Sequence, residues 1–530
     1  MSKKVLLGDE AIAQGAIDAG ISGVYAYPGT PSTEITEYIQ KSAPGREKKV
    51  RSDWSANEKT AMEAAIGMSY AGKRALVCMK HVGLNVAADA FVNTAITGVN
   101  GGLVVVAADD PSMHSSQNEQ DSRFYGKFSL LPVIEPSDQQ EAYDMTRYAF
   151  DLSERTGLPV LLRITTRLAH SRSGINTEPA RAQNELRLPG DLKQFILLPA
   201  FARKRYKKLL ADQTILEMDA SGSGLNRREP GKDLSRGIIV AGIAYNYYRE
   251  AANRHGFDYP LIKISQYPVP KEWISEMAGE VGELFVIEEG YPMIEEAMTG
   301  MLQNKFTVHG RLDGTLPRDG ELTPLLVEKA FLPVDKQGME VPGLVVNRPP
   351  ALCKGCSHID MYNALNEALE PYGPGRVFSD IGCYTLGALP PYNAINSCVD
   401  MGASVTMAKG AVDAGLQPAV AVIGDSTFTH SGMTGLLDAI LENSPLTVII
   451  SDNSTTGMTG GQKSHATNRL YSICTGLGVD PEHVRVINPL RKNHRENTDI
   501  IAEELAYRGI SVIISQRECI QTALRRKREG

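Results

Sequence analysis

The sequence predicts an α/β protein made of three doubly wound domains with mostly parallel sheets. Two observations support this prediction. Short apolar strand patterns alternate with helical patterns along the chain, which is the order that builds parallel sheets covered by helices. Glycine is also abundant, at 49 of 530 residues, and suits the tight turns of such folds. A chain of this length exceeds one hydrophobic core and corresponds to about three or four domains.

The first predicted domain covers residues 1–190. Residues 9–19 predict a helix that ends at Gly20, and residues 23–27 predict a strand. Thr30 followed by Pro31 predicts a helix cap and the first position of the next helix. The patterns that follow predict strands at 75–80, 102–108 and 159–164, and helices at 57–71, 84–98 and 138–156.

The rest of the chain divides into a connecting segment and two further domains. Residues 191–236 are polar, and we expect a linker with an exposed loop whose basic stretch, 202–208, is a solvated helix face. A middle α/β domain is predicted at 237–345. The last domain, 346–530, has predicted strands at 376–381, 419–424, 446–451 and 511–516.

Composition excludes several classes of function. The net charge of −7 offers no basic excess for nucleic acid. No apolar run approaches the ~20 residues of a membrane span, and the start of the chain lacks the apolar core of a signal peptide. Seven cysteines are a poor disulfide framework for a chain of 530 residues. We therefore expect a cytoplasmic protein without nucleic-acid or membrane partners.

Two strand ends in the last domain predict a site for Mg²⁺ and phosphate groups. Asp425 follows the strand 419–424, and Asn453 follows the next strand 28 residues later. Carboxyl ends of parallel strands share one edge of a sheet, where ligands bind. The Asp425 carboxylate, the Asn453 amide oxygen and the Thr455 carbonyl would form half of a magnesium shell, and Gly424 would let the backbone approach the phosphates. Each pair, Gly-Asp or Asp-Asn, taken alone is more often an ordinary turn.

Four cysteines suggest an iron–sulfur cluster. Cys353 and Cys356 form a C-x-x-C pair, and Cys383 and Cys519 follow. Thiolates bind such clusters in sets of four. On spacing alone, zinc and simple packing remain alternatives, and Cys474 is a second candidate for the fourth ligand. We interpret Cys78 and Cys398 as packing residues.

The motifs of the chain resemble one family over nearly its whole length. The G-D-S…D-N arrangement is similar to the thiamine diphosphate motif. The motifs with the most specific resemblance are GDEAIAQGAIDAG (8–20), YAYPGTPSTEI (25–35), RPPALCKGCSH (348–358), SDIGCYTLGALPP (379–391), DMGAS (400–404), GDSTFTHSGM (424–433) and TTGMTGGQ (455–462). Together they resemble the α subunits of indolepyruvate ferredoxin oxidoreductases, which belong to the 2-oxoacid:ferredoxin oxidoreductases. The resemblance implies that the first and last domains are of the thiamine diphosphate-binding type, pyrimidine-binding and diphosphate-binding respectively.

The resemblance also implies cofactors and the residues that hold them. It implies a [4Fe–4S] cluster on Cys353, Cys356, Cys383 and Cys519, and thiamine diphosphate with Mg²⁺ on Asp425, Asn453 and Thr455. The other implied cofactor-binding positions are Gly382, Cys383, Tyr384, Asp400, Gly402, Gly424, Ser426, Met458 and Thr459. The middle domain is implied as the place for CoA and subunit contacts.

Glu58 has two interpretations. As part of Ser55-Ala56-Asn57-Glu58 it fits a capping box, in which the glutamate satisfies an N-terminal amide. The resemblance instead implies that Glu58 is the carboxylate that activates the aminopyrimidine of thiamine, because the family's glutamate lies in the same N-E-x-x-A setting. Glu63, one turn further, is the natural control.

Substrate contacts are less well defined. Thr30 is implied as a substrate-contacting threonine, with a plain helix cap as its alternative. In residues 107–125 no arginine is in register to hold the substrate carboxylate, and the nearest polar candidates are Gln117, Asn118 and Arg123. Met458 suits an apolar pocket, although a lone methionine is more often filler.

The implied activity is oxidative decarboxylation of an arylpyruvate, such as indolepyruvate or phenylpyruvate, to an acyl-CoA and CO₂. The implied partners are a smaller β subunit in an α₂β₂ assembly and ferredoxin or another electron carrier. Other 2-oxoacid substrates, a non-redox thiamine-dependent lyase and a scaffold without catalysis are the alternatives. The chain departs from the family in two places: it has C-K-G-C-S-H where C-P-G-C-P-H is common, and we see no C-terminal ferredoxin-like module after Cys519.

Overall fold

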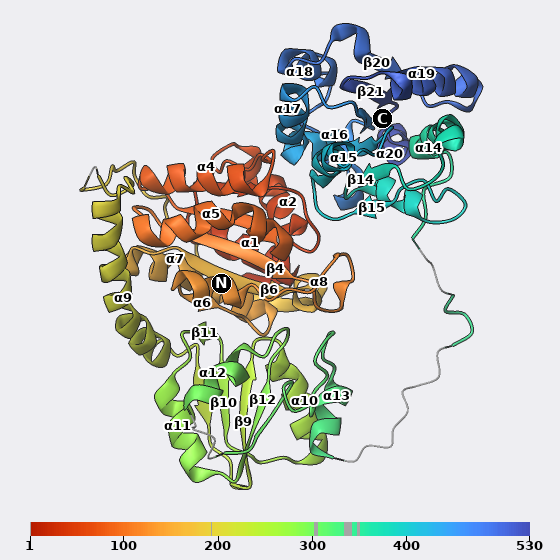
Figure 1. Ribbon diagram of the computed structural model, residues 1–530. Coiled ribbons are helices and arrows are strands. Elements are labelled where there is room, and N and C mark those ends of the chain that lie inside the picture. The colour runs from red at the N-terminus through yellow and green to blue at the C-terminus, as the bar shows by residue number, and fades with distance from the viewer. Residues whose placement is uncertain (1, 192, 302–305, 333–341, 347–349, 530) are drawn as a thin grey trace. The chain divides into compact units, whose positions relative to one another are not determined.

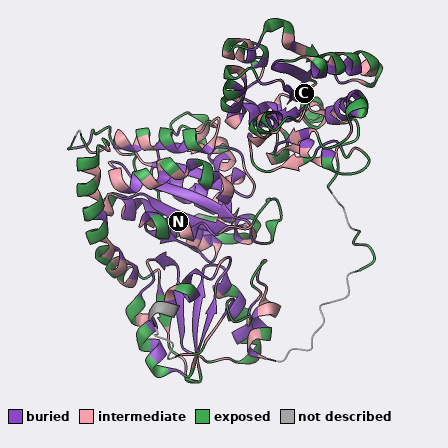
Figure 2. Cartoon of the chain, in the orientation of Figure 1, coloured by how far each residue is buried: buried purple, intermediate pink, exposed green. Residues whose placement is uncertain are grey.

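The computed structural model describes residues 2–191, 193–301, 306–332, 342–346 and 350–529. It divides into two compact units, Met1–Gly338 and Met339–Gly530 (Figure 1). The buried residues follow the strands of the sheets, and the helices present exposed faces (Figure 2). These mostly parallel sheets between helices confirm the predicted α/β class. Among the described residues no helix is both long and apolar enough to cross a membrane.

The N-terminal sheet has the strand order β11-β5-β6-β4-β3-β2. All its neighbouring strands are parallel except β11 and β5. The strands are β2 (Gly23–Ala26), β3 (Ala75–Lys80), β4 (Leu103–Asp109), β5 (Val133–Ile134), β6 (Val160–Thr165) and β11 (Gln266–Tyr267). β3, β4 and β6 are buried along their whole length, as expected for parallel strands covered on both faces. The predicted strands of this domain are therefore confirmed.

Helices cover this sheet, and a two-stranded ribbon of β1 (Ser2–Leu7) and β7 (Arg172–Thr177) lies beside it. The helices are α1 (Gly8–Asp18), α2 (Thr33–Lys41), α3 (Ala43–Arg46), α4 (Glu58–Tyr70), α5 (His81–Thr97), α6 (Arg123–Ser129), α7 (Gln139–Thr156) and α8 (Thr166–His170). The cap predicted at Thr30 is wrong. Helix α2 begins at Thr33 after Ser32, because the Ser32 hydroxyl donates to the Gly29 carbonyl and forms a separate turn.

The segment 191–236, which the sequence predicted as a linker with an exposed loop, is largely regular structure. It contains helix α9 (Pro199–Gly222) and strand β8 (Arg227–Glu229). Helix α9 packs against α5 through a few apolar residues, of which Leu209 and Leu216 are buried. The expected solvated helix face at 202–208 is present, since most of its basic side chains are exposed.

The middle domain has a second sheet, in the order β13-β12-β9-β10-β8. Its strands are β9 (Arg236–Ala241), β10 (Leu261–Ile264), β12 (Glu283–Ile287) and β13 (Val308–His309), together with β8. Its helices are α10 (Ala244–His255), α11 (Lys271–Glu280), α12 (Met293–Met301) and α13 (Pro324–Phe331). Strand β11, which follows β10 in the chain, joins the N-terminal sheet, so the first two domains form one compact unit.

The second unit has one sheet in the order β15-β14-β16-β17-β21-β20, with all neighbours parallel. The strands are β14 (Val377–Ser379), β15 (Ser397–Cys398), β16 (Val420–Gly424), β17 (Thr447–Asp452), β20 (Val484–Ile487) and β21 (Ser511–Gln516). The main helices are α14 (Ser357–Leu369), α15 (Ala403–Asp413), α16 (Asp425–Thr427), α17 (Met433–Leu441), α18 (Leu470–Leu477), α19 (His494–Ala506) and α20 (Ile520–Glu529). The four predicted strands of this domain are confirmed.

Candidate functional site

The predicted magnesium ligands lie at one edge of the second unit's sheet. Strands β16 and β17 are adjacent and parallel, so Asp425 and Asn453 follow neighbouring strand ends. Asp425 is 2% exposed, and its Oδ2 atom has no hydrogen-bond partner among the described residues. Burial, with the nearby charge of Asp452, raises the pKa of Asp425 to about 7. A buried carboxylate with a free oxygen is stabilised by a cation, so this position fits a metal ion.

Asn453 and Thr455 complete the loop beside Asp425. The Asn453 side-chain oxygen accepts a hydrogen bond from the Thr455 backbone N–H at 3.1 Å, and an amide oxygen has a second lone pair for a cation. Thr455 begins the short strand β18 (Thr455–Thr456), which pairs with β19 (Gln462–Lys463). The hydroxyl groups of Ser426 and Thr456 are 3.0 Å apart and link the two loops. The donor set is all oxygen, which suits Mg²⁺.

Two glycines of the site make room for a tyrosine ring. A Cβ atom at Gly382 or Gly424 would lie 2.4 Å or 2.6 Å from the Tyr384 ring. Tyr384 is buried, and its hydroxyl bonds the Ile381 carbonyl and the Thr427 hydroxyl, each at 3.2 Å. Gly424 therefore accommodates Tyr384, and its role in letting the backbone approach the phosphates stays a prediction.

Asp380, at the end of β14, was missed by the sequence analysis. Its carboxylate accepts hydrogen bonds from the backbone N–H groups of Gly402 (2.7 Å) and Ser404 (3.2 Å). Burial raises the pKa of Asp380 to about 6. The Gly402 N–H is thus used within the protein, at the start of α15, and Asp400 is exposed beside it. The strand-end pair Ser379-Asp380 was the available signal.

Met458 and Thr459 lie on an exposed turn, Gly457–Thr459, beyond Asn453. The Met458 side chain is 60% exposed. The Thr459 hydroxyl donates to the Gln462 side chain at 2.6 Å. A Cβ atom on Gly457 would lie 3.2 Å from the sulfur of Cys383 and 3.9 Å from the Asn453 side-chain nitrogen, so this turn lies close to both residues.

The structure groups the four predicted cluster cysteines. Burial, together with the neighbouring Cys356, Cys519 and Cys353 thiols, raises the pKa of the Cys383 thiol to about 12. Burial also raises the pKa of the Cys356 thiol, and the neighbouring Cys353 and Cys519 thiols contribute to this rise. These cysteines come from chain segments that are far apart in sequence, and the fold brings them together.

Local backbone geometry positions the cysteine group. The Cys356 N–H donates to the Cys353 carbonyl at 2.9 Å, and Gly355 between them has φ +80°, a conformation that glycine adopts without strain. The Cys519 N–H donates to the Asn453 carbonyl at 3.1 Å. One backbone hydrogen bond therefore ties the cysteine group to the predicted metal loop.

The other cysteines lie outside this group. Cys474 is buried in the apolar core around α18, and burial raises the pKa of its thiol to about 12 without a neighbouring thiol. Cys78 is buried in the core of the N-terminal domain, and the Cys398 thiol donates weakly to the Asp380 carbonyl at 3.5 Å. Cys519 is thus the better candidate for a fourth ligand than Cys474.

The spacing of the four thiols can be compared with that of a zinc site and of an iron–sulfur cluster. Among the described residues, no three of the cysteine sulfurs lie within 4.8 Å of one another. A tetrahedral zinc site with Zn–S bonds of about 2.3 Å holds its sulfurs ~3.8 Å apart. An iron–sulfur cubane carries its thiolates on separate iron corners, so its ligands stand further apart. The four thiols as they stand therefore do not have the close spacing of a bound zinc site.

In the first unit, Glu58 is buried at the start of α4. The capping box of this helix is formed by Asn57 and Thr60, which bond each other reciprocally. The cap that the sequence analysis drew around Glu58 therefore belongs to other residues. The Glu58 side chain instead packs on α5, where a Cβ atom on Gly83 would lie 2.6 Å from its Oε1 atom. Glu63 is exposed and pairs with Lys59.

Thr30 lies next to a lysine that the sequence analysis did not identify. Lys80, at the end of β3, is 9% exposed, and its ammonium group donates to the Ser115 carbonyl at 2.5 Å. The Ser115 hydroxyl donates to the Thr30 carbonyl at 3.4 Å. Burial lowers the pKa of Lys80 to about 8, against the opposing effect of Asp110. The strand-end position of Lys80 was the only signal for it.

Arg123 is not available to hold a substrate. It is fully buried and pairs with Asp121 and Glu288, at 2.9 Å for Glu288. Its guanidinium also donates to the Tyr267 hydroxyl at 3.1 Å. Arg123 thus joins the N-terminal domain to the middle domain. Gln117 and Asn118 are exposed.

Comparisons with known proteins show the family to which the chain belongs. Residues 14–197 match the model of the pyruvate flavodoxin/ferredoxin oxidoreductase, thiamine diphosphate-binding family, and residues 380–515 match that of the thiamine pyrophosphate enzyme, C-terminal TPP binding domain. Indolepyruvate oxidoreductase subunit IorA of Archaeoglobus fulgidus is 38% identical over 100% of this chain and 88% of its own length. The chain belongs to this family.

Members of the IorA family from other archaea are similarly close. The subunit of Methanothermobacter thermautotrophicus is 38% identical, covering 98% of this chain and 87% of its own. A solved 2-oxoglutarate:ferredoxin oxidoreductase from Magnetococcus marinus shares the fold, with a TM-score of 0.50 and 17% identity over 62% of this chain and 64% of that one. The chain is accordingly a thiamine diphosphate-dependent 2-oxoacid oxidoreductase of the IorA family.

Proposed function

We propose that this chain catalyses the oxidative decarboxylation of an aromatic 2-oxoacid and passes the electrons to a [4Fe–4S] cluster on Cys353, Cys356, Cys383 and Cys519. The observation that carries the proposal is the position of the cysteine group beside the metal loop, where the Cys519 N–H bonds the Asn453 carbonyl. Electron transfer requires this proximity between a redox centre and the reacting cofactor.

In this proposal the second unit holds the charged end of the cofactor. Asp425, Asn453 and Thr455 would hold Mg²⁺, which would supply positive charge for the diphosphate. The unpartnered Oδ2 atom of Asp425 supports this role. Thiamine diphosphate, when bound, supplies the electron sink for decarboxylation of a 2-oxoacid. A [4Fe–4S] cluster, when bound, accepts electrons one at a time.

The first unit supplies the acid–base and binding groups. Glu58 holds a proton at N1′ of the aminopyrimidine, and its burial against Gly83 fixes its carboxylate. Lys80 pairs with the carboxylate of the substrate, since it is the buried cation beside Thr30 and Arg123 is committed elsewhere. Thr30 contacts the substrate from the turn before α2.

The aromatic substrate, the acceptor and the partners follow from the relatives. The family members at 35–38% identity are named indolepyruvate oxidoreductase subunits, so we assign an arylpyruvate substrate and a smaller partner subunit. CoA is the proposed acyl acceptor; the Magnetococcus marinus enzyme of the same fold was solved with CoA and succinyl-CoA. Ferredoxin is the proposed electron carrier, and the cytoplasm the compartment, because free thiols persist there.

The test is an anaerobic assay of the chain co-expressed with its small subunit. A panel of 2-oxoacids is supplied with CoA and a viologen dye, and we expect the arylpyruvates to reduce the dye fastest. Iron analysis and visible absorption should show the cluster in wild type and in Cys474→Ser, and its loss in Cys383→Ser or Cys519→Ser. An active but colourless wild-type protein without iron would identify a non-redox thiamine enzyme instead.

A further inference from the structure

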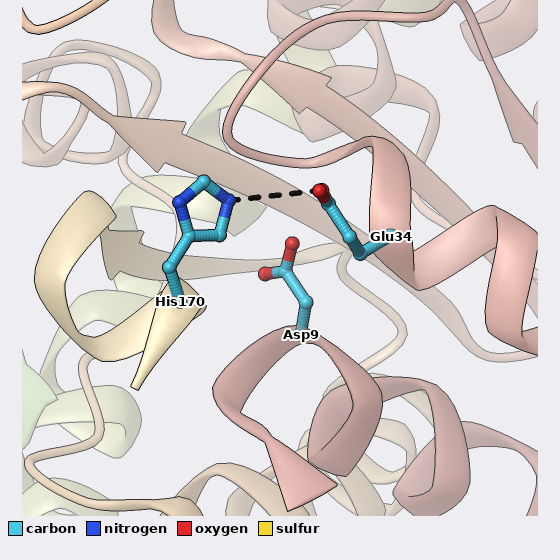
Figure 3. A group of neighbouring side chains, drawn as sticks. All are labelled: Asp9, Glu34 and His170. Atoms are coloured by element: carbon cyan, nitrogen blue, oxygen red, sulfur yellow. Dashed lines mark ion pairs between the residues drawn. The ribbon is translucent and has the colours of Figure 1, made fainter. Parts of the chain in front are cut away.

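A second group of possible metal ligands lies in the N-terminal domain, away from the cysteines. Asp9, Glu34 and His170 each offer one ligand atom, and these atoms all lie within 4.8 Å of one another. Among the described residues this is the only such group of three or more histidine, cysteine or acidic side chains. Figure 3 shows the Asp9 carboxylate pointing between the other two side chains, which form an ion pair at 3.7 Å.

Asp9 is the unusual member of this group. It is completely buried, and neither of its carboxylate oxygens has a hydrogen-bond partner among the described residues. The Oε2 atom of Glu34 is also buried without a hydrogen bond. A buried carboxylate in this state costs several kcal/mol unless it is neutralised or coordinates a cation. The charges that act most on Asp9, those of Glu34 and Glu10, are both negative.

The fold holds the three ligands on separate, tightly packed elements. Asp9 lies in the first turn of α1, Glu34 in the first turn of α2, and His170 ends α8. A Cβ atom on Gly8 would lie 2.2 Å from the Leu168 carbonyl, so only glycine lets α1 approach α8 this closely. The Tyr38 hydroxyl donates to the Gln14 side chain at 2.8 Å and ties α2 to α1.

The group lies near the protein surface. The side chains of Glu34 and His170 are 39% and 36% exposed, whereas Asp9 is completely buried. Two carboxylates and one imidazole are ligands of Zn²⁺, Mn²⁺ and Fe²⁺ rather than of thiolate-bound metals. Three protein ligands leave at least one position for water.

We propose that Asp9, Glu34 and His170 bind a divalent transition-metal ion. This site is distinct from the proposed Mg²⁺ site, whose ligands lie in the other compact unit, and it does not depend on the proposed reaction. The ion would fix the start of α2, which follows the turn that carries Thr30. Its role would be to hold this turn in place.

Mn²⁺ is the probe, because it prefers oxygen and nitrogen ligands and avoids the cysteine group. The full-length chain, loaded with thiamine diphosphate and Mg²⁺, is titrated with Mn²⁺ while electron paramagnetic resonance measures the free ion. We expect wild type to bind one more Mn²⁺ than Asp9→Asn or His170→Gln. Glu37→Gln, on the same helix as Glu34, should bind as wild type does.

Two controls distinguish this site from the diphosphate metal site and from weak binding to surface carboxylates. Asp425→Asn should keep the Asp9-dependent ion, because that ion does not sit on the diphosphate. Mn²⁺ should raise the melting temperature of wild type and leave that of Asp9→Asn unchanged, and the Asn variant, which removes a buried charge without changing shape, should fold. Equal Mn²⁺ binding by wild type and Asp9→Asn, including no binding by either, overturns the proposal.

Discussion

Lys80 is a buried lysine whose charge is sensitive to pH just above neutrality. Burial lowers its pKa to about 8, so its ammonium group loses its proton as the pH rises through that value. If Lys80 pairs with the substrate carboxylate, the KM for the 2-oxoacid should rise above about pH 8, whereas cofactor binding should not change.

Replacing Lys80 should separate substrate binding from cofactor binding. A hydrogen bond to a charged group contributes about 1.5–3 kcal/mol, so Lys80→Met should raise the KM for the 2-oxoacid by roughly 10- to 100-fold. In this variant the KM should no longer increase above about pH 8. Steady-state kinetics and thiamine diphosphate titration provide the measurements. Lys41→Met, at an exposed lysine of α2, is the control. An unchanged KM would show that another group holds the carboxylate.

Individual site residues differ in how far they could be predicted from the sequence. The Asp425–Asn453 pair has a recognisable spacing, whereas the set of four cysteines was implied by the family resemblance, because spacing alone left zinc and packing as alternatives. Lys80 and Asp380 are single polar residues at strand ends, and only burial distinguishes them from ordinary turn residues. The ion pair of Arg123 with Glu288 spans 165 residues, and no local pattern indicates it.

At the scale of elements, the approach of α5 to α4 fixes the Glu58 side chain. Glycine at position 83 is what permits this approach. Gly83→Ala should displace the Glu58 carboxylate and lower kcat, while the sheet beneath stays intact. The matched control is Gly67→Ala on α4, where a new Cβ meets nothing within 4 Å and should stabilise the helix by roughly 0.5–1 kcal/mol. Equal kcat values for the two variants would contradict this role of the helix contact.

Elements with a strong apolar pattern were predicted closely, and elements without one were not. The buried strands β3, β4 and β6 are nearly continuous apolar runs, which made them easy to identify. Helix α9 is largely polar and has only Leu209, Leu216 and Ala220 buried, so its sequence resembles that of a linker. The start of α2 was misplaced because a serine turn, formed by local hydrogen bonds, precedes the helix.

At the scale of the whole molecule, buried charges join the N-terminal and middle domains. The carbonyl of Glu289 accepts hydrogen bonds from Arg123 and Arg163 at 3.2 Å and 3.0 Å. Burial raises the pKa of the Glu289 carboxyl from 4.5 to about 7, against the opposing effect of Arg311. The folded state therefore keeps this proton over a pH range in which the unfolded state has lost it.

This difference predicts a pH dependence of stability. Between about pH 4.5 and 7 the folded state binds more protons than the unfolded state, so the contribution of Glu289 to the free energy of unfolding falls as the pH rises. Glu289→Gln should remove this decline and be more stable than wild type above pH 7, as urea unfolding at several pH values would show. Glu296→Gln, at an exposed position of α12, should behave like wild type. A Glu289→Gln protein with the wild-type pH profile would exclude this account.

A substitution in the first compact unit should lower turnover without loss of the cluster. Glu58→Gln should reduce turnover by about 10²- to 10⁴-fold and leave iron content and thiamine diphosphate binding unchanged. In that variant dithionite should reduce the cluster, but the 2-oxoacid should not. Glu63→Gln should retain turnover. Turnover by Glu58→Gln at the wild-type rate would mean that Glu58 has only a packing role.

The hydrogen bond from the Cys519 N–H to the Asn453 carbonyl has a consequence for assembly. If thiamine diphosphate and the proposed cluster occupy these two sites, each would restrain the same piece of backbone, so the second cofactor to bind would lose less conformational entropy. Thermodynamic reciprocity then requires the two effects to be equal. If a bound cluster raises the affinity for thiamine diphosphate by some factor, bound thiamine diphosphate raises the affinity for the cluster by the same factor. Binding of the two cofactors would thus be cooperative, and a chain that lacks one of them would bind the other more weakly.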